Sequence, residues 1–279
     1  PAPGETLEGQ SYGIFPGGKG ANQAFAAARL GGNVRMLGQI GADANGALLR
    51  ASLASAGVDL ARLSEDSGVA SGVALISIDG SGQNQIVIVP GANGTFNVER
   101  LERQRDAFDG AAVVLLQLEI PLPTVERAAR LAKERGALVM LDPAPARPLP
   151  DSLLADVDYL TPNEIELAAL TDSTDLTEAG RLRSRGVKNV LVKLGERGAM
   201  LINAEGARRW PAFPVTAIDT TAAGDCFNAA LAVALTEGRP PDEAVPFANA
   251  AAAVSVTRRG AQPGMPTRGE VEEMLKSSD

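Results

Sequence analysis

Histidine is absent from this chain of 279 residues, and cysteine occurs once, as Cys226. Without histidine the chain cannot build a Ser-His-Asp triad, a histidine general base or a Cys/His zinc site. A lone cysteine cannot form a disulfide within the chain. Any general-base chemistry must therefore use another side chain.

Long apolar runs and an excess of basic charge are also missing. No apolar stretch approaches the about 18 residues needed to cross a bilayer, and no basic segment followed by an apolar one opens the chain. We therefore expect no membrane association and a cytoplasmic location. Lys and Arg number 26 against 34 Asp and Glu, and the net charge of −8 weighs against nucleic acid as a partner. A small phosphorylated ligand stays compatible with this charge, because a local site can override it.

The remaining composition, 45% apolar and 22% charged, is that of an ordinary globular protein. Short apolar runs alternate with alanine-rich helical stretches, a pattern typical of βαβ units. We predict one α/β domain over residues 1–279, with a mainly parallel central sheet flanked by helices. The predicted buried strands are Val113–Leu118, Ala137–Leu141, Val157–Leu160 and Asn189–Leu194. The predicted helices are Pro121–Arg135, Pro162–Leu170, Asp175–Arg185, Ala223–Thr236, Asp242–Thr257 and Arg268–Leu275.

Residues 68–90 follow a different pattern. Val73–Ile78 and Gln85–Val89 flank Asp79-Gly80-Ser81-Gly82, which is a turn signal between two strands. We predict a β hairpin that forms part of a small lid over the main domain. Gly4–Tyr12 fits a further lid strand loosely, which places lid strands at about 4–14 and 68–90.

Two glycine-containing segments are candidate ligand sites. Gly17–Asn22 precedes an alanine-rich helix predicted at Ala24–Leu30, and glycines there let the backbone approach a ligand closely. Gly13 and Gly18-Lys19 match the spacing of a Walker A loop, but Gly20 stands where Ser or Thr is required and no convincing strand precedes the loop, so it is not a P-loop. A generic turn into a helix remains the alternative interpretation.

The second segment, Ile218–Phe227, gives the strongest local signal. Its small residues leave the amides of Ala222–Asp225 free to bind an anion at the start of a helix. Asp225 then has two interpretations, a first-turn carboxylate that only stabilises the helix or a general base beside a phosphate. An aspartate is ionised at neutral pH and needs no histidine partner to accept a proton.

Taken in order along the chain, these motifs resemble the ribokinase-like carbohydrate kinases, also called the PfkB family. The likeness covers nearly the whole chain, and a set of motifs in the family's order is far more specific than either segment alone. The segments that carry it are Gly17–Asn22, Gln117–Glu119, Asp142–Arg147, Thr161–Glu164, Lys193–Gly198, Asp219–Asp225 and Gly260–Pro263.

The resemblance implies ATP-dependent phosphorylation of the 5-hydroxyl of D-ribose. It assigns Asp225 as the catalytic base and the amides of Ala222, Ala223 and Gly224 as the anion hole. The sugar-binding residues that it implies, together with Asp225, are Gly18, Lys19, Gly20, Ala21, Asn22 and Glu119.

The resemblance also implies ATP, Mg²⁺ and a monovalent cation, potassium, as cofactors. The implied nucleotide-binding residues are Asn163, Lys193, Leu194, Gly195, Glu196, Arg197, Gly198, Gly224 and Asn249. Glu164 is the implied carboxylate near Mg²⁺, with a solvated helix-start role as the alternative. The implied cation ligands are Asp219, Thr221, Ser255, Arg258, Gly260 and Gly264, where Gly264 stands at a position that often offers a serine hydroxyl.

Two further expectations follow from the resemblance. The family begins with a strand ending in an Asn-x-Asp motif that binds the sugar, and neither is visible here, so we expect the natural N-terminus to extend beyond Pro1. We also expect a homodimer formed through the lid strands, because exposed β edges invite pairing. The alternatives are a kinase of the same family for another sugar or nucleoside and a sensor that binds sugar or nucleotide without catalysis.

Overall fold

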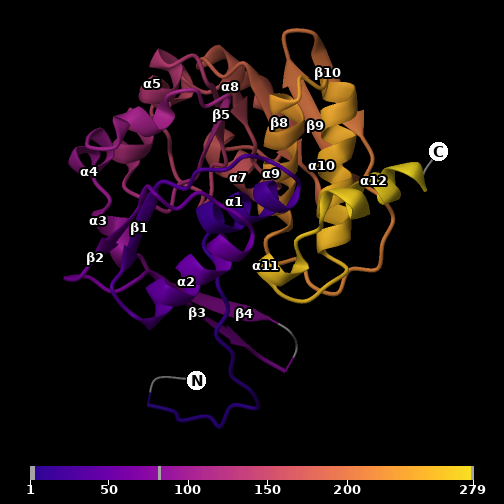
Figure 1. Cartoon of the computed structure of the whole chain (residues 1–279). Helices are drawn as coiled ribbons and strands as arrows, with labels where there is room; N and C mark the ends of the chain where they lie inside the picture. Colours follow the sequence, from indigo (N-terminus) through magenta and orange to yellow (C-terminus); the bar gives the residue numbers. More distant parts are fainter. Residues whose placement is uncertain (1–3, 81–82, 278–279) are drawn as a thin grey trace.

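In the computed structural model, which describes residues 4–80 and 83–277, a six-stranded sheet forms the centre of the molecule (Figure 1). Its strand order is β10-β9-β8-β7-β6-β5. Strands β5 to β8 are parallel, whereas β9 pairs antiparallel with both β8 and β10. The predicted mainly parallel sheet is therefore confirmed. The strands are β5 (Val113–Leu116), β6 (Leu138–Leu141), β7 (Tyr159–Leu160), β8 (Asn189–Lys193), β9 (Ala199–Asn203) and β10 (Gly206–Trp210).

Helices cover both faces of this sheet. Along β6, Val139 and Leu141 pack into one core cluster and Met140 into the other, since successive side chains of a strand point to opposite faces. The first cluster includes side chains of α5 (Leu122–Glu134) and α8 (Ala179–Ser184). The second contains α1, α9, α10 and α12. Their bounds are Lys19–Arg29, Ala223–Thr236, Pro241–Ser255 and Arg268–Lys276.

Most predicted elements are present, with shifted ends. Helix α9 and strand β3 have the predicted bounds, whereas the strand predicted at Val157–Leu160 is reduced to Tyr159–Leu160. The first helix starts at Lys19 rather than Ala24, immediately after Gly18 with its positive φ of 94°. The glycine-rich segment is therefore mostly the first turn of α1. The remaining short elements after β6 are α6 (Asp151–Leu154), α7 (Glu164–Thr171), η2 (Leu176–Glu178), η3 (Gly195–Arg197) and α11 (Ala261–Gly264).

A second, two-stranded parallel sheet lies beside α1. It consists of β1 (Gly38–Gly41) and β2 (Leu63–Asp66), joined by α2 (Ala44–Ser55). Leu53, Ile40 and Leu63 form a small core of their own with Ala24 of α1. The elements between the hairpin and β5 are α3 (Ala92–Thr95), α4 (Val98–Glu102) and η1 (Arg105–Phe108).

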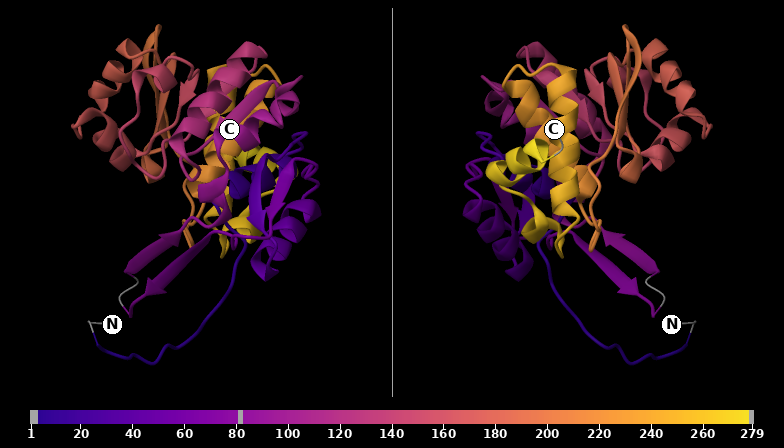
Figure 2. Two further views of the ribbon diagram at one scale, coloured as in Figure 1. Left: turned by 90° about the vertical axis from the view of Figure 1, so that its left-hand side faces the viewer. Right: turned by 90° about the vertical axis from the view of Figure 1, so that its right-hand side faces the viewer.

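The predicted hairpin projects from the body of the molecule (Figure 2). Its strands β3 (Val73–Ile78) and β4 (Asn84–Val89) pair only with each other within the described residues. The lid strand expected at about 4–14 is wrong, because residues 5–18 hold no strand and residues 4–15 are exposed. Gly4–Tyr12 contains two glycines and two glutamates, residues that are depleted in strands, and too little apolar surface to bury.

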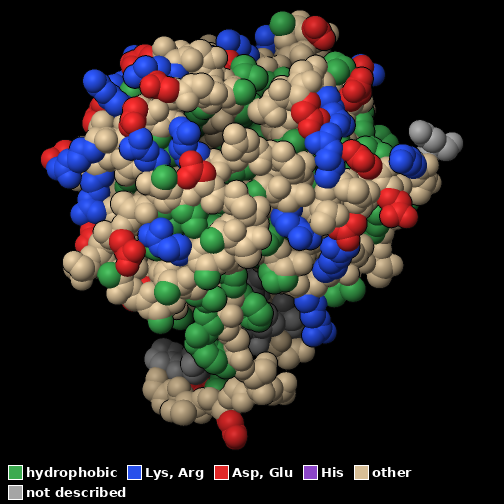
Figure 3. All heavy atoms as spheres, viewed as in Figure 1, with side chains coloured by type: hydrophobic (Ala, Val, Ile, Leu, Met, Phe, Trp, Pro, Cys, Tyr) green, Lys and Arg blue, Asp and Glu red, His purple; other side chains and the backbone are tan. Residues whose placement is uncertain are grey.

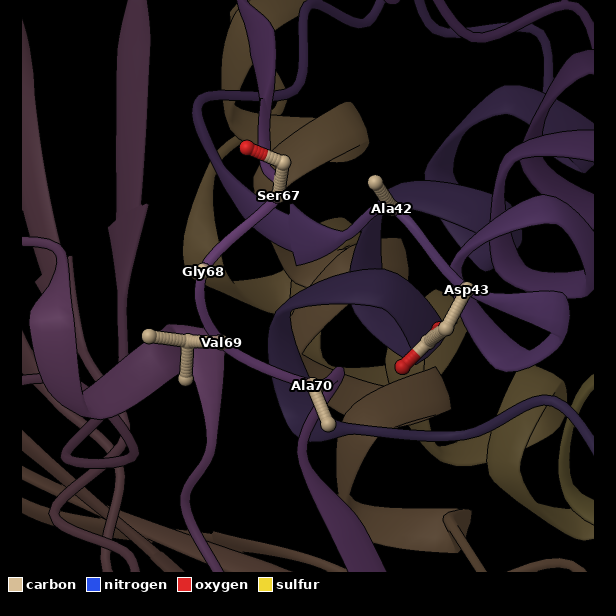
Figure 4. Close-up of a pocket in the computed structure, with 6 residues that line it drawn as sticks. All are labelled: Ala42, Asp43, Ser67, Gly68, Val69 and Ala70. Atoms are coloured by element: carbon tan, nitrogen blue, oxygen red, sulfur yellow. The ribbon is translucent and has the colours of Figure 1, made fainter.

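Close backbone packing fixes the base of the hairpin. Asp43 accepts hydrogen bonds from the Ser71 amide at 2.8 Å and the Ser71 hydroxyl at 2.7 Å, which ties the start of α2 to the chain entering β3. A Cβ on Gly91 would lie 2.4 Å from the Ala70 carbonyl oxygen, so only glycine fits there. A surface pocket of about 250 Å³ lies at this junction, between Ala42-Asp43 and residues 67–70 (Figure 4). The Asp43 carboxylate is already engaged in holding the junction.

Candidate active site

The carboxyl ends of β5, β6 and β8 meet the first turns of α1 and α9. Gln117 follows β5 directly, Asp142 follows β6 and Lys193 ends β8. Parallel strands place their carboxyl ends at one edge of the sheet, which is where open α/β proteins bind ligands. The geometry brings the two predicted segments, near residues 18–23 and 219–225, to this same edge.

Asp225 lies at the meeting point of α1 and α9 and is 4% exposed. Its Oδ2 accepts a hydrogen bond from Asn22 Nδ2 at 3.0 Å, and its Oδ1 accepts one from Gln23 Nε2, also at 3.0 Å. Burial raises the pKa of Asp225, while the nearby Lys19 ammonium and these amides oppose that rise. Two amides hold the carboxylate in one orientation, and among the described residues no cationic group forms an ion pair with it, which leaves it able to act as a general base.

Lys19 and Glu119 form the neighbouring wall. The Lys19 amide donates to Glu119 Oε2 at 2.8 Å, and a Cβ on Gly18 would lie 3.8 Å from the same oxygen. Burial lowers the pKa of Lys19, but the charges of Asp142, Asp225 and other carboxylates outweigh it, so the net pKa is raised. Burial raises the pKa of Glu119 against the opposing effect of Lys19. The predicted sugar-binding residues thus lie together around Asp225.

The start of α9 provides backbone N–H groups beside Asp225. Ala222, with a left-handed φ of 60°, turns the chain into the helix, and no side chain caps it. The Ala223 amide donates to the Thr220 carbonyl oxygen at 3.2 Å, whereas within residues 4–80 and 83–277 no acceptor contacts the Gly224 amide. Unpaired amides at a helix N-terminus attract an anion. Of the predicted anion hole, Ala223 is therefore engaged in a turn and Gly224 is available.

The predicted nucleotide segment is a tight turn after β8. The Leu194 amide donates to the Gly198 carbonyl oxygen at 2.8 Å across Gly195–Arg197. A Cβ on Gly198 would lie 2.1 Å from the Trp210 carbonyl oxygen, and Asn249 Nδ2 donates to the adjacent Pro211 carbonyl oxygen at 3.0 Å. These contacts bring Asn249 next to the turn, as predicted, although its amide nitrogen is engaged by the backbone. Glu196 is an exposed residue of the turn.

The structure separates the two carboxylates that follow Asn163. Glu164 is half-exposed and forms an ion pair with Arg197. Glu166 is 7% exposed and forms a capping box with Asn163, in which each residue's side chain accepts the other's amide N–H at 2.8 Å. Burial raises the pKa of Glu166, and the charge of the nearby Lys193 opposes the rise. The sequence interpretation chose Glu164 and missed Glu166, although the Asn-x-x-Glu spacing of a capping box was visible.

The sequence assigned no role in the site to two other residues, Gln23 and Asp142. Gln23 donates to both Asp225 and Asp142, and accepts from Gln117. Asp142 lies at the centre of a buried group with Lys193 Nζ at 2.8 Å and Lys19 Nζ at 3.7 Å. The sequence signal that could have identified Asp142 is its position, because it directly follows a strand predicted to be buried.

A corner beside α9 collects the expected cation ligands. The Asp219 carboxylate accepts the Gly260 amide at 2.8 Å, and the carbonyl oxygens of Ser255 and Arg258 lie 3.1 and 3.7 Å from a Cβ built on Gly264. Hydrogen bonds from the Thr221 hydroxyl and from backbone amides hold the pKa of Asp219 below its usual value. The corner offers an ionised carboxylate and carbonyl oxygens, donors that suit an alkali cation.

A family model described as "pfkB family carbohydrate kinase" matches residues 2–268. The chain belongs to the pfkB family of carbohydrate kinases. It is 43% identical over 281 residues to a protein named ribokinase from Haemophilus influenzae, a match that covers 98% of this chain and 92% of that protein. It is 36% identical to a deoxyribokinase from Salmonella typhi, covering all of this chain and 94% of that one.

Solved structures of this family have the same fold. The structure of Arabidopsis thaliana ribokinase complexed with ribose and ATP superposes with a TM-score of 0.91 at 37% identity, covering 98% of this chain and 91% of that one. The expected family and its α/β fold with a small β sheet are therefore confirmed. Within the described residues, no helix is long and apolar enough to span a membrane.

Proposed function

We propose that this protein transfers the γ-phosphoryl group of ATP to the 5-hydroxyl of D-ribose, giving ribose 5-phosphate and ADP. The observation that carries the proposal is Asp225, a buried carboxylate held by Asn22 and Gln23 beside the free Gly224 amide. This places a proton acceptor next to a site for anionic phosphate, which is what phosphoryl transfer to an alcohol needs. The Arabidopsis relative, 37% identical, is complexed with ribose and ATP.

In this mechanism the residues of the chain position the substrates and stabilise charge. Asp225 accepts the proton of the sugar hydroxyl while its oxygen attacks the γ-phosphorus. The bond from that phosphorus to the bridging oxygen breaks, and ADP leaves with the electron pair. The free Gly224 amide at the start of α9 stabilises the negative charge on the transferred group. Lys19, Asn22 and Glu119 hold the sugar so that one hydroxyl faces Asp225.

ATP would bind along Lys193–Gly198, with Asn249 and Asn163 near it. Lys193, at the end of β8 before the Gly195–Arg197 turn, lies against the start of α9, where a Cβ on Gly224 would be 3.4 Å from its Nζ. A nucleotide lying there directs its phosphates toward the positive end of α9. An ATP-consuming enzyme of this kind also fits the expected cytoplasmic location.

Mg²⁺ would lie on the phosphates with Glu166, rather than Glu164, as the nearest carboxylate. Among the described residues no group of three or more acidic, cysteine or histidine side chains could hold a metal alone. Mg²⁺ keeps several waters and binds substrate phosphates, so one carboxylate at the edge of the site fits it. When bound, the ion neutralises charge on the β- and γ-phosphates.

A monovalent cation, potassium, would bind in the corner formed by Asp219, Thr221, Ser255, Arg258, Gly260 and Gly264. These residues fit such an ion because they offer a carboxylate and convergent carbonyl oxygens. Gly264 supplies no hydroxyl, so water or a backbone carbonyl would complete the shell. The corner adjoins the start of α9, where a cation would strengthen the field at the anion hole.

The hairpin would serve as a lid and as the interface of a homodimer. Leu75, Ile76, Ile86, Val87 and Ile88 are each more than half exposed. Leu75 pairs with Val87 and Ile76 with Ile86, so both faces of the ribbon are apolar. Figure 3 shows hydrophobic side chains gathered on the projecting part of the molecule, with charged groups spread over the body. Apolar surface of this kind favours contact with a partner or a substrate.

The proposal is tested by ADP release from MgATP with D-ribose, 2-deoxy-D-ribose and a panel of other sugars and nucleosides, in potassium and in sodium. We expect the highest kcat/KM with D-ribose. Turnover only with another substrate would change the proposed substrate and leave the proposed mechanism in place. Deoxyribose is the first alternative to test, because the chain is 36% identical to a deoxyribokinase. Binding of ribose or nucleotide without ADP release would contradict the kinase and identify a sensor.

A further inference from the structure

A buried ion pair forms the sheet side of the candidate active site. Asp142 follows β6 and Lys193 ends β8, and these strands flank β7 in the sheet. Lys193 Nζ donates to Asp142 Oδ1 at 2.8 Å, with side chains that are 13% and 1% exposed. Desolvating two charges often costs as much as their attraction returns, so apolar side chains could stabilise this position as well. The pair therefore points to a role beyond packing.

The Lys193 ammonium also contacts the start of α9. A Cβ built on Gly224 would lie 3.4 Å from Lys193 Nζ, so the ammonium rests against the residue whose amide is free. An ammonium has three N–H groups. Within the described part of the chain, Asp142 is the acceptor that Lys193 Nζ contacts, which leaves N–H groups for an anion beside Gly224.

We propose that Lys193 is a catalytic residue that donates a hydrogen bond to the transferred phosphoryl group, and that Asp142 positions it. The inference rests on the proposed function. As the sugar oxygen bonds to the γ-phosphorus, its proton goes to Asp225 and the bond to the ADP oxygen breaks. Charge on the three equatorial oxygens is then shared by the Gly224 amide and Lys193 Nζ. A cation fixed before the reaction stabilises that charge without reorganisation.

Asp142 also connects this cation to the base. Its Oδ1 accepts from Lys193, and its Oδ2 accepts from Gln23 Nε2 at 3.2 Å. The same Gln23 nitrogen donates to Asp225 Oδ1 at 3.0 Å. One carboxylate thereby sets the distance between the group that accepts the proton and the group that stabilises the phosphoryl charge.

The test is a double-mutant cycle with Lys193→Met, Asp142→Asn and the double variant. If Asp142 acts only by positioning Lys193, then Asp142→Asn should cause no further loss of kcat in a protein that already carries Lys193→Met. If the two residues act independently, their effects on kcat should multiply, so the cycle distinguishes the two cases. Lys133→Met is the matched control, since Lys133 also pairs with a buried aspartate, Asp158, at 2.7 Å, but at the opposite end of the parallel strands. Each variant is assayed for kcat and KM with ribose and ATP. Binding of MgADP is measured with and without aluminium fluoride, which mimics the transferred group.

We expect Lys193→Met to lower kcat by about 10²-fold, comparable to the loss of one oxyanion-hole donor. Its affinity for MgADP should stay within about twofold of the wild type, while the gain in affinity from aluminium fluoride is lost. Asp142→Asn should lower kcat by about tenfold alone and add no further loss to Lys193→Met. Lys193→Arg, which keeps the charge, should recover part of the rate.

A kcat for Lys193→Met no lower than that of Lys133→Met would overturn the inference. If Lys193→Met does not fold, the double variant is tested instead, because it lacks both charges of the pair. A kcat of the double variant equal to that of the wild type would contradict the proposal. Failure of the proposed function is distinct, because the wild-type enzyme would then release no ADP with ribose. Wild-type turnover that Asp225→Asn abolishes and Lys193→Met leaves intact refutes only the Lys193 assignment.

Discussion

At the scale of single residues, the candidate site is built around one carboxylate in a place that disfavours its charge. Asp225 is 4% exposed, and burial raises its pKa. Lys19 is the largest influence opposing that rise. The position of the lysine therefore sets the pH at which the base becomes protonated.

This gives a prediction for the pH profile of kcat/KM, which reports the free enzyme. Because Asp225 must be deprotonated to accept a proton, activity should fall as the pH drops through its raised pKa, above the ordinary value of 3.8. Lys19→Met removes the opposing charge, so we expect its acid limb at higher pH than that of the wild type. Lys133→Met should leave the limb in place. An acid limb that stays put or moves down in Lys19→Met would refute the electrostatic role of Lys19.

The residues that gather at the site were predictable where a motif names them and not where only the fold brings groups together. Asp225, Asn22 and Lys19 follow from segments with small residues before a helix. Glu166 and Asp142 do not, since a capping box and a strand end occur in many proteins without function. Their importance comes from the end of the sheet, where β5, β6 and β8 place Gln117, Asp142 and Lys193 side by side.

At the scale of elements, helix α12 is fixed to the loop that carries the cation corner. Thr267 caps the helix in a capping box with Glu270, and Glu270 forms an ion pair with Arg258 of the corner. The hydrogen bond from Arg258, followed by those from Thr267, lowers the pKa of Glu270 from 4.5 to about 2. The last helix thereby stabilises the segment that carries the expected cation ligands.

We predict that Glu270→Gln lowers the Tm at neutral pH. The folded-state pKa of Glu270 lies below the unfolded one, so its stabilisation is present above about pH 4.5 and is lost as the pH falls toward about 2. The difference in Tm between the variant and the wild type should therefore shrink over this range. Glu205→Gln, in an exposed turn, is the control. A Tm difference that is independent of pH would contradict the assignment.

Element prediction succeeded where an apolar, alanine-rich run is long. Helix α9, in which residues 225–234 are all buried, was predicted with its observed bounds. The pair β1 and β2 was missed, since Gly38–Gly41 and Leu63–Asp66 each contain one large apolar residue. Pairing between them depends on packing against Ala24 and Leu53, which no local pattern encodes.

At the scale of the whole molecule, the proposed roles of the projecting hairpin would link assembly and substrate binding. One face carries Leu75 and Val87 and the other carries Ile76 and Ile86. A lid that also dimerises would use one face toward the sugar and the other toward the partner. The N-terminal segment, which the sequence placed in the same lid, forms no strand over residues 5–18 and does not pair with the hairpin.

The two faces can be tested separately with Leu75→Glu and Ile76→Glu. We expect one variant to sediment as a monomer, because its glutamate would bury a charge in the dimer interface. The other should keep the wild-type mass and show a raised KM for ribose, because its glutamate would bury a charge where the lid contacts the sugar. Leu48→Glu, on the partly exposed surface of α2, is the control. A monomeric wild type, or two variants with unchanged mass and KM, would contradict the double role of the hairpin.

The central claim is that Asp225 accepts the proton of the ribose 5-hydroxyl during phosphoryl transfer. The most direct measurement is a rapid-quench single turnover of ATP with D-ribose by the wild type and Asp225→Asn, with the product position determined by phosphorus NMR. The account predicts ribose 5-phosphate from the wild type and a chemical step about 10²–10⁴-fold slower in Asp225→Asn, with ribose and ATP affinities nearly unchanged. A transfer step in Asp225→Asn at the wild-type rate, or a phosphate on another hydroxyl, would contradict it.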